Sequence, residues 1–278
     1  IFRNMFINKP ILICLIFLSS ANSIFANEVN IYTSRHYDSD VKLYQDFMDQ
    51  TGIKVNIISA KGNALIERLK SEGENSPADI FITVDAGNLW KVQNYGLFRP
   101  INSDNINLIV PKKYRGVNNE WIALAKRARV IFYNKQSYLD EDLKNLSYET
   151  LNSEKWKNKL AIRSSNNLYN QSLVASLIAR YGEDYTEKWA KGLVENFARK
   201  PQGNDRAQII AVANNEADLA IANSYYLGLM LSGKKGDKQL NAGKKVKILF
   251  PSQNKYGAHI NISGAGIMKA SKNYNNAI

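Results

Sequence analysis

The chain has 278 residues, of which 45% are hydrophobic and 22% are charged, a composition typical of a globular protein rather than a disordered one. Its formal net charge of +12 would suit a nucleic-acid partner. The lysines, however, are scattered in pairs without a nucleic-acid-binding motif, so we expect a solvated basic surface and no nucleic acid.

The first segment, residues 1–26, is predicted to be a cleaved signal peptide. A positively charged start precedes the apolar run Ile11–Leu18, and small and polar residues follow as far as Ala26. The run is far shorter than the roughly 20 residues of a membrane span. Cleavage after Ala26 would remove Cys14, the only cysteine, so we expect a periplasmic protein without disulfides or thiolate metal ligands.

Strand and helix patterns alternate along the first half of the chain. Asp38 or Ser39 is expected to cap the first helix, and Gly52 to end it. Strands alternating with helices imply parallel pairing and an α/β fold. The expected strands are 29–32, 53–59 and 78–85, and the expected helices are 38–52, 63–73 and 86–96.

The alternation weakens over residues 99–121 and then resumes. The expected later strands are 128–134, 216–224, 245–251 and 258–268, and the expected helices are 168–182, 185–200 and 205–215. Residues 269–278 begin a helix-like pattern that stops without a glycine cap or a polar tail. We therefore expect further C-terminal residues in the natural protein.

Four tyrosines stand where a helix is expected to begin, although the chain has 15 in all. Tyr37 precedes the first helix, Tyr169 starts a later one, and Tyr225 and Tyr226 follow a strand in "IANSYYLGLM". In α/β sheets, ligands gather outside the carboxyl ends of the strands, at such turns. Three separate turns thus offer phenol groups to one place.

Phenols that serve as ligands at neutral pH need a highly charged cation, because a phenol ordinarily titrates near pH 10. Hard anionic oxygen donors suit Fe(III), whereas zinc prefers histidine or cysteine and calcium prefers carboxylates. The chain has only two histidines, His36 and His259. The pattern therefore predicts a ferric site, although any one of these tyrosines taken singly is more often a packed ring.

The roles of the two histidines differ in expectation. His36, beside Tyr37, is a candidate metal ligand, with a hydrogen bond to the site as the equal alternative. His259, in "GAHINISGAG", is expected to be structural or to line a hinge.

Four stretches resemble the extracytoplasmic ferric-iron-binding proteins of ABC importers, particularly the cyanobacterial type, and the similarity extends over nearly all of the chain after residue 26. The stretches are "NIYTSRHYDSD", "RSSNNLYNQSL", "ANSYYLG" and "GAHINISGAG". The resemblance implies a two-lobed periplasmic-binding-protein (type II) α/β fold with a ligand cleft between the lobes. It also implies a monomer that binds Fe(III) and delivers it to an ABC permease in the inner membrane.

By this resemblance, Tyr37 comes from the first lobe and the other three tyrosines from the second. Arg129 resembles an arginine beside the metal that offsets phenolate charge, and Arg206 is a further candidate for that role. Arg127 is expected to face solvent. Four phenolates around Fe(III) leave a single negative charge, so we expect no obligatory exogenous anion, with a water completing the coordination.

The resemblance also sets the expected domain boundaries. The first lobe is expected to span 27–126, completed by 252–278 and missing C-terminal residues, and the second lobe to span 127–251. The chain would cross between the lobes near 125–130 and again near 250–253.

Two other functions are compatible with parts of the sequence. "TSR" (33–35) and "RSSNN" (163–167) at helix starts could hold phosphate or sulfate, which would make the protein an oxyanion carrier. A non-haem iron enzyme is the alternative of another class, but two distant histidines make a poor ligand set for it, and no catalytic motif is present. We therefore expect a binding protein and not an enzyme.

Overall fold

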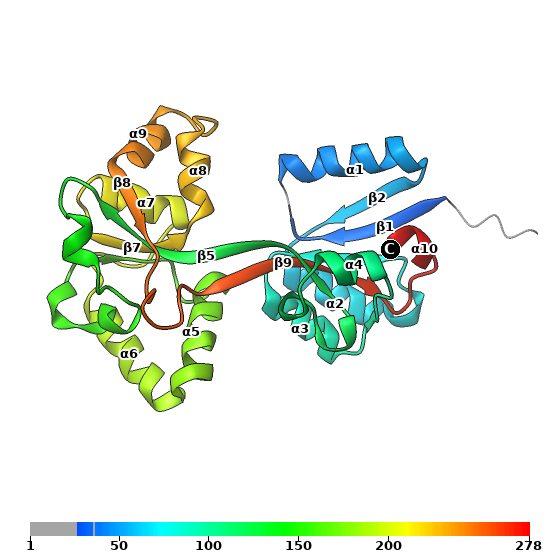
Figure 1. Ribbon diagram of the computed structural model, residues 1–278, viewed down its shortest axis with the longest axis horizontal. Coiled ribbons are helices and arrows are strands. Elements are labelled where there is room, and N and C mark those ends of the chain that lie inside the picture. The colour runs from blue at the N-terminus through cyan, green and yellow to red at the C-terminus, as the bar shows by residue number, and fades with distance from the viewer. Residues whose placement is uncertain (1–26, 36) are drawn as a thin grey trace, which may run out of the picture.

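Two lobes joined by two long strands make up the protein, in a computed structural model that describes residues 27–35 and 37–278 (Figure 1). The joining strands are β5 (Ile122–Asn134) and β9 (Ile260–Met268). The predicted signal peptide and His36 lie outside the described residues. Within the described part of the chain, no helix is long and apolar enough to cross a membrane.

The first lobe is a sheet in the order β2-β1-β3-β9-β5, with β4 paired to β9. Its buried core comes from both the sheet and α2 and α3, and includes Tyr32, Leu65, Phe81 and Leu89. The other strands of this lobe are β1 (Glu28–Thr33), β2 (Lys54–Ser59), β3 (Ile80–Thr83) and β4 (Phe98–Arg99). Its helices are α1 (Asp38–Thr51), α2 (Gly62–Glu72), α3 (Ala86–Asn94), α4 (Asp104–Ile109) and α10 (Tyr274–Ala277).

The second lobe is built on the far half of β5, which pairs with β7 and β8, while β6 pairs with β7. Apolar clusters cover both faces of this sheet, one around Trp189 and the other around Ile209 and Val212. The other strands are β6 (Leu160–Ala161), β7 (Leu219–Asn223) and β8 (Val246–Leu249). The helices are α5 (Leu168–Tyr181), α6 (Glu183–Glu195), α7 (Asp205–Ala213), α8 (Tyr225–Leu231) and α9 (Asp237–Lys245).

The predicted α/β fold is confirmed, but parallel pairing is only partial, because every strand pair that includes β5 or β9 is antiparallel. Strands β1, β2 and β3 are parallel, and so are β6 and β7. Strands β5 and β9 instead run antiparallel. The reason is topological, because β5 leads the chain from the first lobe to the second and β9 brings it back.

The change of partner along β5 marks the junction of the lobes. β5 pairs with β9 as far as Ala128, opposite Ile260, and with β7 from Arg129 onward. The return segment after β8 stays with the second lobe, because Tyr256 contacts Tyr181 through a 2.7 Å hydroxyl–hydroxyl hydrogen bond. We therefore propose that the return crossing falls near Ile260 rather than at 250–253.

The observed start of the first helix differs slightly from the predicted one. Helix α1 begins at Asp38 with Tyr37 as its N-cap, so the expected cap at Asp38 or Ser39 was one or two residues late. Tyr37 has extended backbone angles, which place the first helical residue directly after it. The lobe boundary between 126 and 127 stays a prediction, and the return crossing proposed above would move the boundary between 251 and 252 to near Ile260.

Strand β9 packs so closely in the first lobe that Gly264 has no room for a side chain. A Cβ atom at this position would lie 2.5 Å from the carbonyl oxygen of Ile122 and 2.6 Å from Leu89. Gly264→Ala is therefore expected to lower the free energy of unfolding by about 1–3 kcal/mol, measured by urea denaturation with tryptophan fluorescence.

Gly228→Ala is the matched control, because a Cβ at Gly228 in α8 meets nothing within 4 Å. It should leave the stability unchanged or raise it by up to about 1 kcal/mol, since alanine favours a helix over glycine. Equal stability of Gly264→Ala and the wild type would contradict the close packing of β9.

Candidate metal centre

The four candidate tyrosines lie at the starts of three helices, as expected. Tyr37 is the N-cap of α1 in the first lobe, and Tyr169 is the second residue of α5 in the second lobe. Tyr225 and Tyr226 open α8 directly after β7. Parallel strands place the turns that follow them at one edge of the sheet, and this brings α5 and α8 to the side that faces the first lobe.

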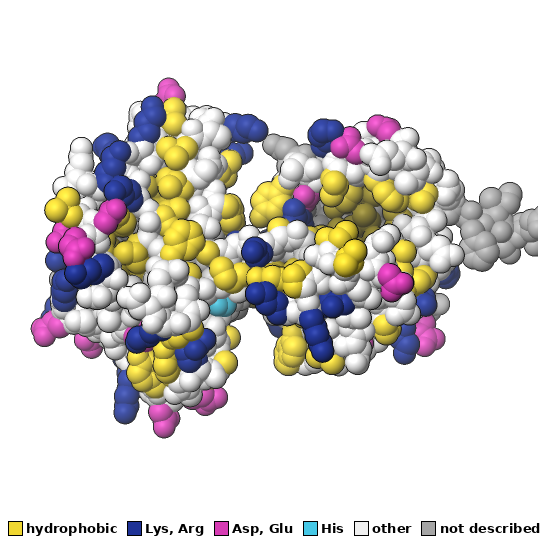
Figure 2. All heavy atoms as spheres, viewed as in Figure 1, with side chains coloured by type: hydrophobic (Ala, Val, Ile, Leu, Met, Phe, Trp, Pro, Cys, Tyr) yellow, Lys and Arg dark blue, Asp and Glu magenta, His cyan; other side chains and the backbone are white. Residues whose placement is uncertain are grey.

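The structure brings these phenols together. The rings of Tyr225 and Tyr226 lie 4.3 Å apart, centroid to centroid. Tyr169 is close enough to act electrostatically on both, and Tyr37 acts on Tyr225 from the opposite lobe. All four are half-buried. The cluster therefore spans the hollow between the lobes that Figure 2 shows.

Burial and mutual repulsion oppose ionisation of the paired tyrosines. Burial raises the pKa of Tyr226 to about 12, with a further rise from Tyr169. Burial raises the pKa of Tyr225 still further, helped by Tyr169 and Tyr226. Both phenols are therefore neutral at pH 7 when nothing is bound, and only a strongly charged cation would hold them as phenolates.

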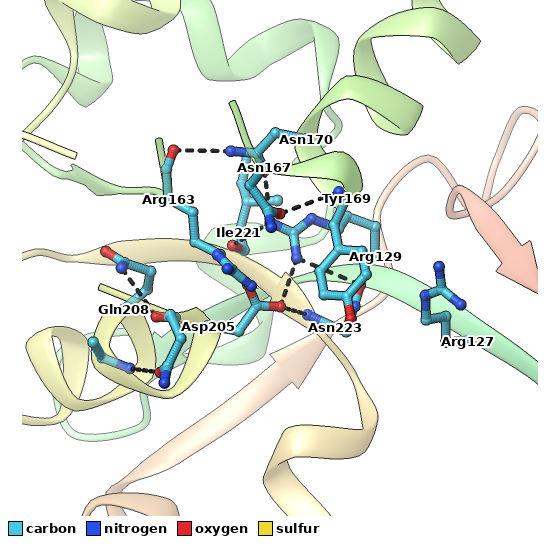
Figure 3. Close-up of polar contacts among 12 residues, drawn as sticks. Arg127, Arg129, Arg163, Asn167, Tyr169, Asn170, Asp205, Gln208, Ile221 and Asn223 are labelled. Carbon is cyan, nitrogen blue, oxygen red and sulfur yellow. Dashed lines mark hydrogen bonds and ion pairs between the residues drawn. The ribbon is translucent and has the colours of Figure 1, made fainter. Parts of the chain in front are cut away.

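Three guanidinium groups flank the ring of Tyr169. The guanidinium carbons of Arg127, Arg163 and Arg129 lie 5.0, 5.5 and 5.9 Å from its centroid. Figure 3 shows Arg129 and Arg163 on one side of the ring and Arg127 on the other. Arg127 is paired with Asp85, whereas Arg129 and Arg163 share Asp205, so one positive charge in excess remains beside the ring to offset phenolate charge.

Beneath the tyrosines, Arg129 and Asp205 form a buried ion pair. Arg129 is 2% exposed, Asp205 is fully buried, and their closest nitrogen and oxygen atoms lie 2.7 Å apart. Arg129 also donates to Asn170 at 2.7 Å, and Asp205 accepts the backbone N–H of Asn223 at 2.8 Å (Figure 3). This network ties α7, α5 and β7 to the start of the second-lobe half of β5.

Several buried polar atoms beside Tyr169 lack partners. Arg129 Nε and Asn223 Nδ2 find no acceptor among the described residues, and His259 Nε2 has no partner there either. These side chains line a narrow space next to Tyr169. Unmatched donors of this kind fit anionic oxygens such as phenolates, so the surroundings suit the proposed donor set.

His259 lies immediately before β9, at the junction of the lobes. Its carbonyl oxygen accepts the N–H of Arg129 at 2.9 Å, and its own N–H donates to Tyr148 Oη at 3.1 Å. Burial, together with Arg129 and Arg127, lowers the pKa of His259 to about 4. Its ring is therefore neutral at physiological pH and adds no positive charge to the site.

The three arginines considered in the sequence analysis lie in different surroundings. Arg129 lies beside Tyr169, whereas Arg206 donates to Gln239 at 3.3 Å. The expectation that Arg127 faces solvent was wrong, because it is 9% exposed and forms an ion pair with Asp85 at 3.0 Å. The metal-ligand roles of the four tyrosines and of His36 stay predictions, as do the charge-balancing roles of Arg129 and Arg206.

Sequence reasoning missed Asp205 at this centre, and it considered Arg163 only as part of a possible oxyanion site. Asp205 sits in "QGNDRAQI", where an acidic residue after an asparagine indicates only a helix start. Arg163 pairs with Asp205 at 3.4 Å. Both roles depend on contacts between residues about 40 positions or more apart, for which a single sequence gives no signal.

The described residues include no group of three or more histidine, cysteine, aspartate or glutamate side chains that could hold a metal. The candidate oxyanion arginines are already paired. Arg35 makes two hydrogen bonds of 2.7 Å to Asp40, and Arg163 is paired with Asp205.

Comparisons with known proteins agree on one family. The profile of the bacterial extracellular solute-binding protein family matches residues 75–275. Iron uptake protein A1 of Synechocystis sp. is 48% identical over 251 residues, covering 90% of this chain and 69% of the relative. The major ferric iron-binding protein of Neisseria meningitidis is 30% identical, covering 90% and 73%.

Two solved structures show the same fold. The Trichodesmium protein IdiA (FutA), in complex with iron and citrate, superposes with a TM-score of 0.84 at 50% identity, covering 90% of this chain and 78% of that one. The ferric binding protein from Campylobacter jejuni superposes with a TM-score of 0.83 at 42% identity, with the same coverage.

The ion pair beneath the tyrosines can be tested by removing its acid. Asp205→Ala would leave Arg129 buried and charged without its partner, and it should lower the free energy of unfolding by about 3–5 kcal/mol in urea denaturation. Arg206→Ala, one residue along the same helix, removes only a 3.3 Å hydrogen bond to Gln239 and should cost far less. Similar losses for both variants would contradict the network described.

Proposed function

This chain belongs to the bacterial extracellular solute-binding proteins, and we propose that it binds ferric iron outside the cytoplasm through tyrosine phenolates and delivers it to an ABC importer. The resemblance to ferric-iron-binding proteins expected from the sequence is confirmed, since several relatives are iron-uptake or ferric-iron-binding proteins. The proposed ligands are Tyr37, Tyr169, Tyr225 and Tyr226.

One observation carries the proposal, namely the convergence of four phenols from two lobes above a buried, positively charged network. A phenolate is a hard anionic donor, and Fe(III) is the biological cation that suits it. The raised pKa values of Tyr225 and Tyr226 favour highly charged cations, because a weakly charged ion would not offset the free energy of deprotonating them.

Charge counting supports a site without an obligatory anion. Four phenolates and Fe(III) carry one negative charge in excess. Arg129 and Arg163 share the single carboxylate of Asp205, so this buried group carries one positive charge in excess. The two excesses cancel. Arg127 adds nothing to this balance, because Asp85 neutralises it.

Capture would follow closure of the lobes. The second lobe offers three phenols on α5 and α8, and the first lobe contributes Tyr37 when the cleft closes about β5 and β9. Iron favours the closed form because only that form supplies all four ligands. The permease would then recognise the closed protein, a monomer in the periplasm.

The two alternative functions have less support. An oxyanion carrier would leave the four phenols without a task, and its candidate arginines are occupied by Asp40 and Asp205. An oxygen-activating iron enzyme needs open coordination positions and a histidine–carboxylate set, and no such cluster lies in the described part of the chain. We therefore propose a transport role without catalysis.

An absorption titration tests the phenolate ligands. Adding ferric citrate to the wild-type protein should produce a visible phenolate-to-iron charge-transfer band, and Tyr225→Phe should weaken that band and lower the affinity. Tyr95→Phe is the matched control, since Tyr95 is 48% exposed on the first lobe and contacts Lys70. A colourless wild-type protein that is stabilised by phosphate or sulfate would instead favour the oxyanion carrier.

Proton release tests the pKa argument. The phenols of Tyr225 and Tyr226 are neutral before binding, so each one that becomes a ligand must release a proton, and iron affinity should rise with pH. In a pH-stat titration at pH 7, the wild type should release about one proton more per iron than Tyr225→Phe. Equal release from the two proteins would show that Tyr225 is not a phenolate ligand.

A further inference from the structure

Asp85 is a fully buried carboxylate at the junction of the lobes, outside the phenol cluster. It follows β3 and is the N-cap of α3, where it accepts the backbone N–H of Gly87 at 2.9 Å. Three side chains also donate to it, from Arg127 at 3.0 Å, Asn261 at 2.9 Å and Ser172 at 3.0 Å. These donors lie on three different elements.

Two of the donors hold the joining strands. Arg127 on β5 and Asn261 on β9 are directly opposite each other in the β5–β9 register. Asp85 thus binds both members of one cross-strand pair, and Asn261 Oδ1 in turn accepts the N–H of Ala86 at 3.1 Å. Asp85 therefore fixes this pair to the first lobe, one step before the last pair of β5 and β9, Ala128 and Ile260.

The third side-chain donor belongs to the second lobe. Ser172 lies on α5, three residues after Tyr169, and so on the same side of the helix. Its hydroxyl lies 3.0 Å from both carboxylate oxygens of Asp85. Arg127, held by the same carboxylate, also lies 5.0 Å from the ring centre of Tyr169. The position of Tyr169 is thereby tied to the first lobe at two points.

The change of strand partner along β5 falls between these two groups of contacts. β5 exchanges β9 for β7 between Ala128 and Arg129, so rotation there would leave Arg127 and Asn261 with the first lobe. Helix α5 would move with the second lobe. The hydrogen bond from Ser172 to Asp85 is therefore a contact that opening must break.

We propose that Asp85 is a closure latch, which holds α5 and Tyr169 in the closed arrangement through the hydroxyl of Ser172. The consequence for iron retention rests on the proposed function. The latch itself does not, because all of its contacts are between protein groups. It stabilises the closed lobes in the iron-free protein and slows release from the loaded one.

The test removes only the hydroxyl that crosses between the lobes. Ser172→Ala keeps the cap of α3 and the contacts of Asp85 with the joining strands. Ser176→Ala is the matched control, since Ser176 lies one turn further along α5 and donates to the carbonyl of Leu173 at 2.7 Å. Thermal melting would verify that both variants fold.

Two readouts separate the latch from the iron site. Small-angle X-ray scattering of the iron-free proteins should give a larger radius of gyration for Ser172→Ala than for the wild type or Ser176→Ala. Iron release to excess chelator should be roughly tenfold faster in Ser172→Ala, the effect of losing a hydrogen bond to a charged acceptor. Ser172→Thr, which keeps the hydroxyl, should restore both values.

Each outcome decides a different question. Identical scattering for Ser172→Ala and Ser176→Ala would overturn the latch, whatever the iron data show. If the wild type binds no iron, the proposed function fails, while the scattering comparison still tests the latch. Faster release with unchanged scattering would also overturn it, because the effect would then arise locally at Tyr169.

Discussion

The buried ion pair of Arg129 and Asp205 is the interaction on which the rest of the second lobe's site depends. Removing two charges from water costs several kcal/mol for each ion, and only further hydrogen bonds offset that cost. Here the bonds come from Asn170 on α5 and Asn223 on β7, the elements that carry or precede the three second-lobe tyrosines. The pair therefore fixes the spacing of the phenols and places a positive charge beneath them.

The joining strands impose the second constraint. The two lobes meet along one antiparallel pair, and β9 is closely packed around Gly264 in the first lobe. Movement is therefore confined to the exchange of partners after Ala128. At that point Asp85 binds Arg127, just before the exchange, and the carbonyl oxygen of His259 accepts the N–H of Arg129, just after it. Motion about this short segment would separate Tyr37 from the other three phenols.

The shared site of the tyrosines could be predicted from the sequence. The buried ion pairs around it could not, because they join residues far apart in the chain. Tyrosines at strand-to-helix turns predicted a common site, because the turns of parallel strands share one edge. Asp205 and Asp85 resemble ordinary helix caps in the sequence, and their partners are 76 and 42 positions away. Arg127 and Arg129 lie on the same face of β5, and nothing in the strand pattern indicates the buried acids, Asp85 and Asp205, that pair with them.

The central claim is that Tyr37, Tyr169, Tyr225 and Tyr226 together hold one ferric ion. The most direct test is an anomalous difference map, recorded at the iron absorption edge, from crystals of the protein grown with ferric citrate. The account predicts a single strong peak within coordination distance of all four phenol oxygens, with the lobes closed about it. A peak elsewhere, or a closed structure without an iron peak at the four phenol oxygens, would contradict it.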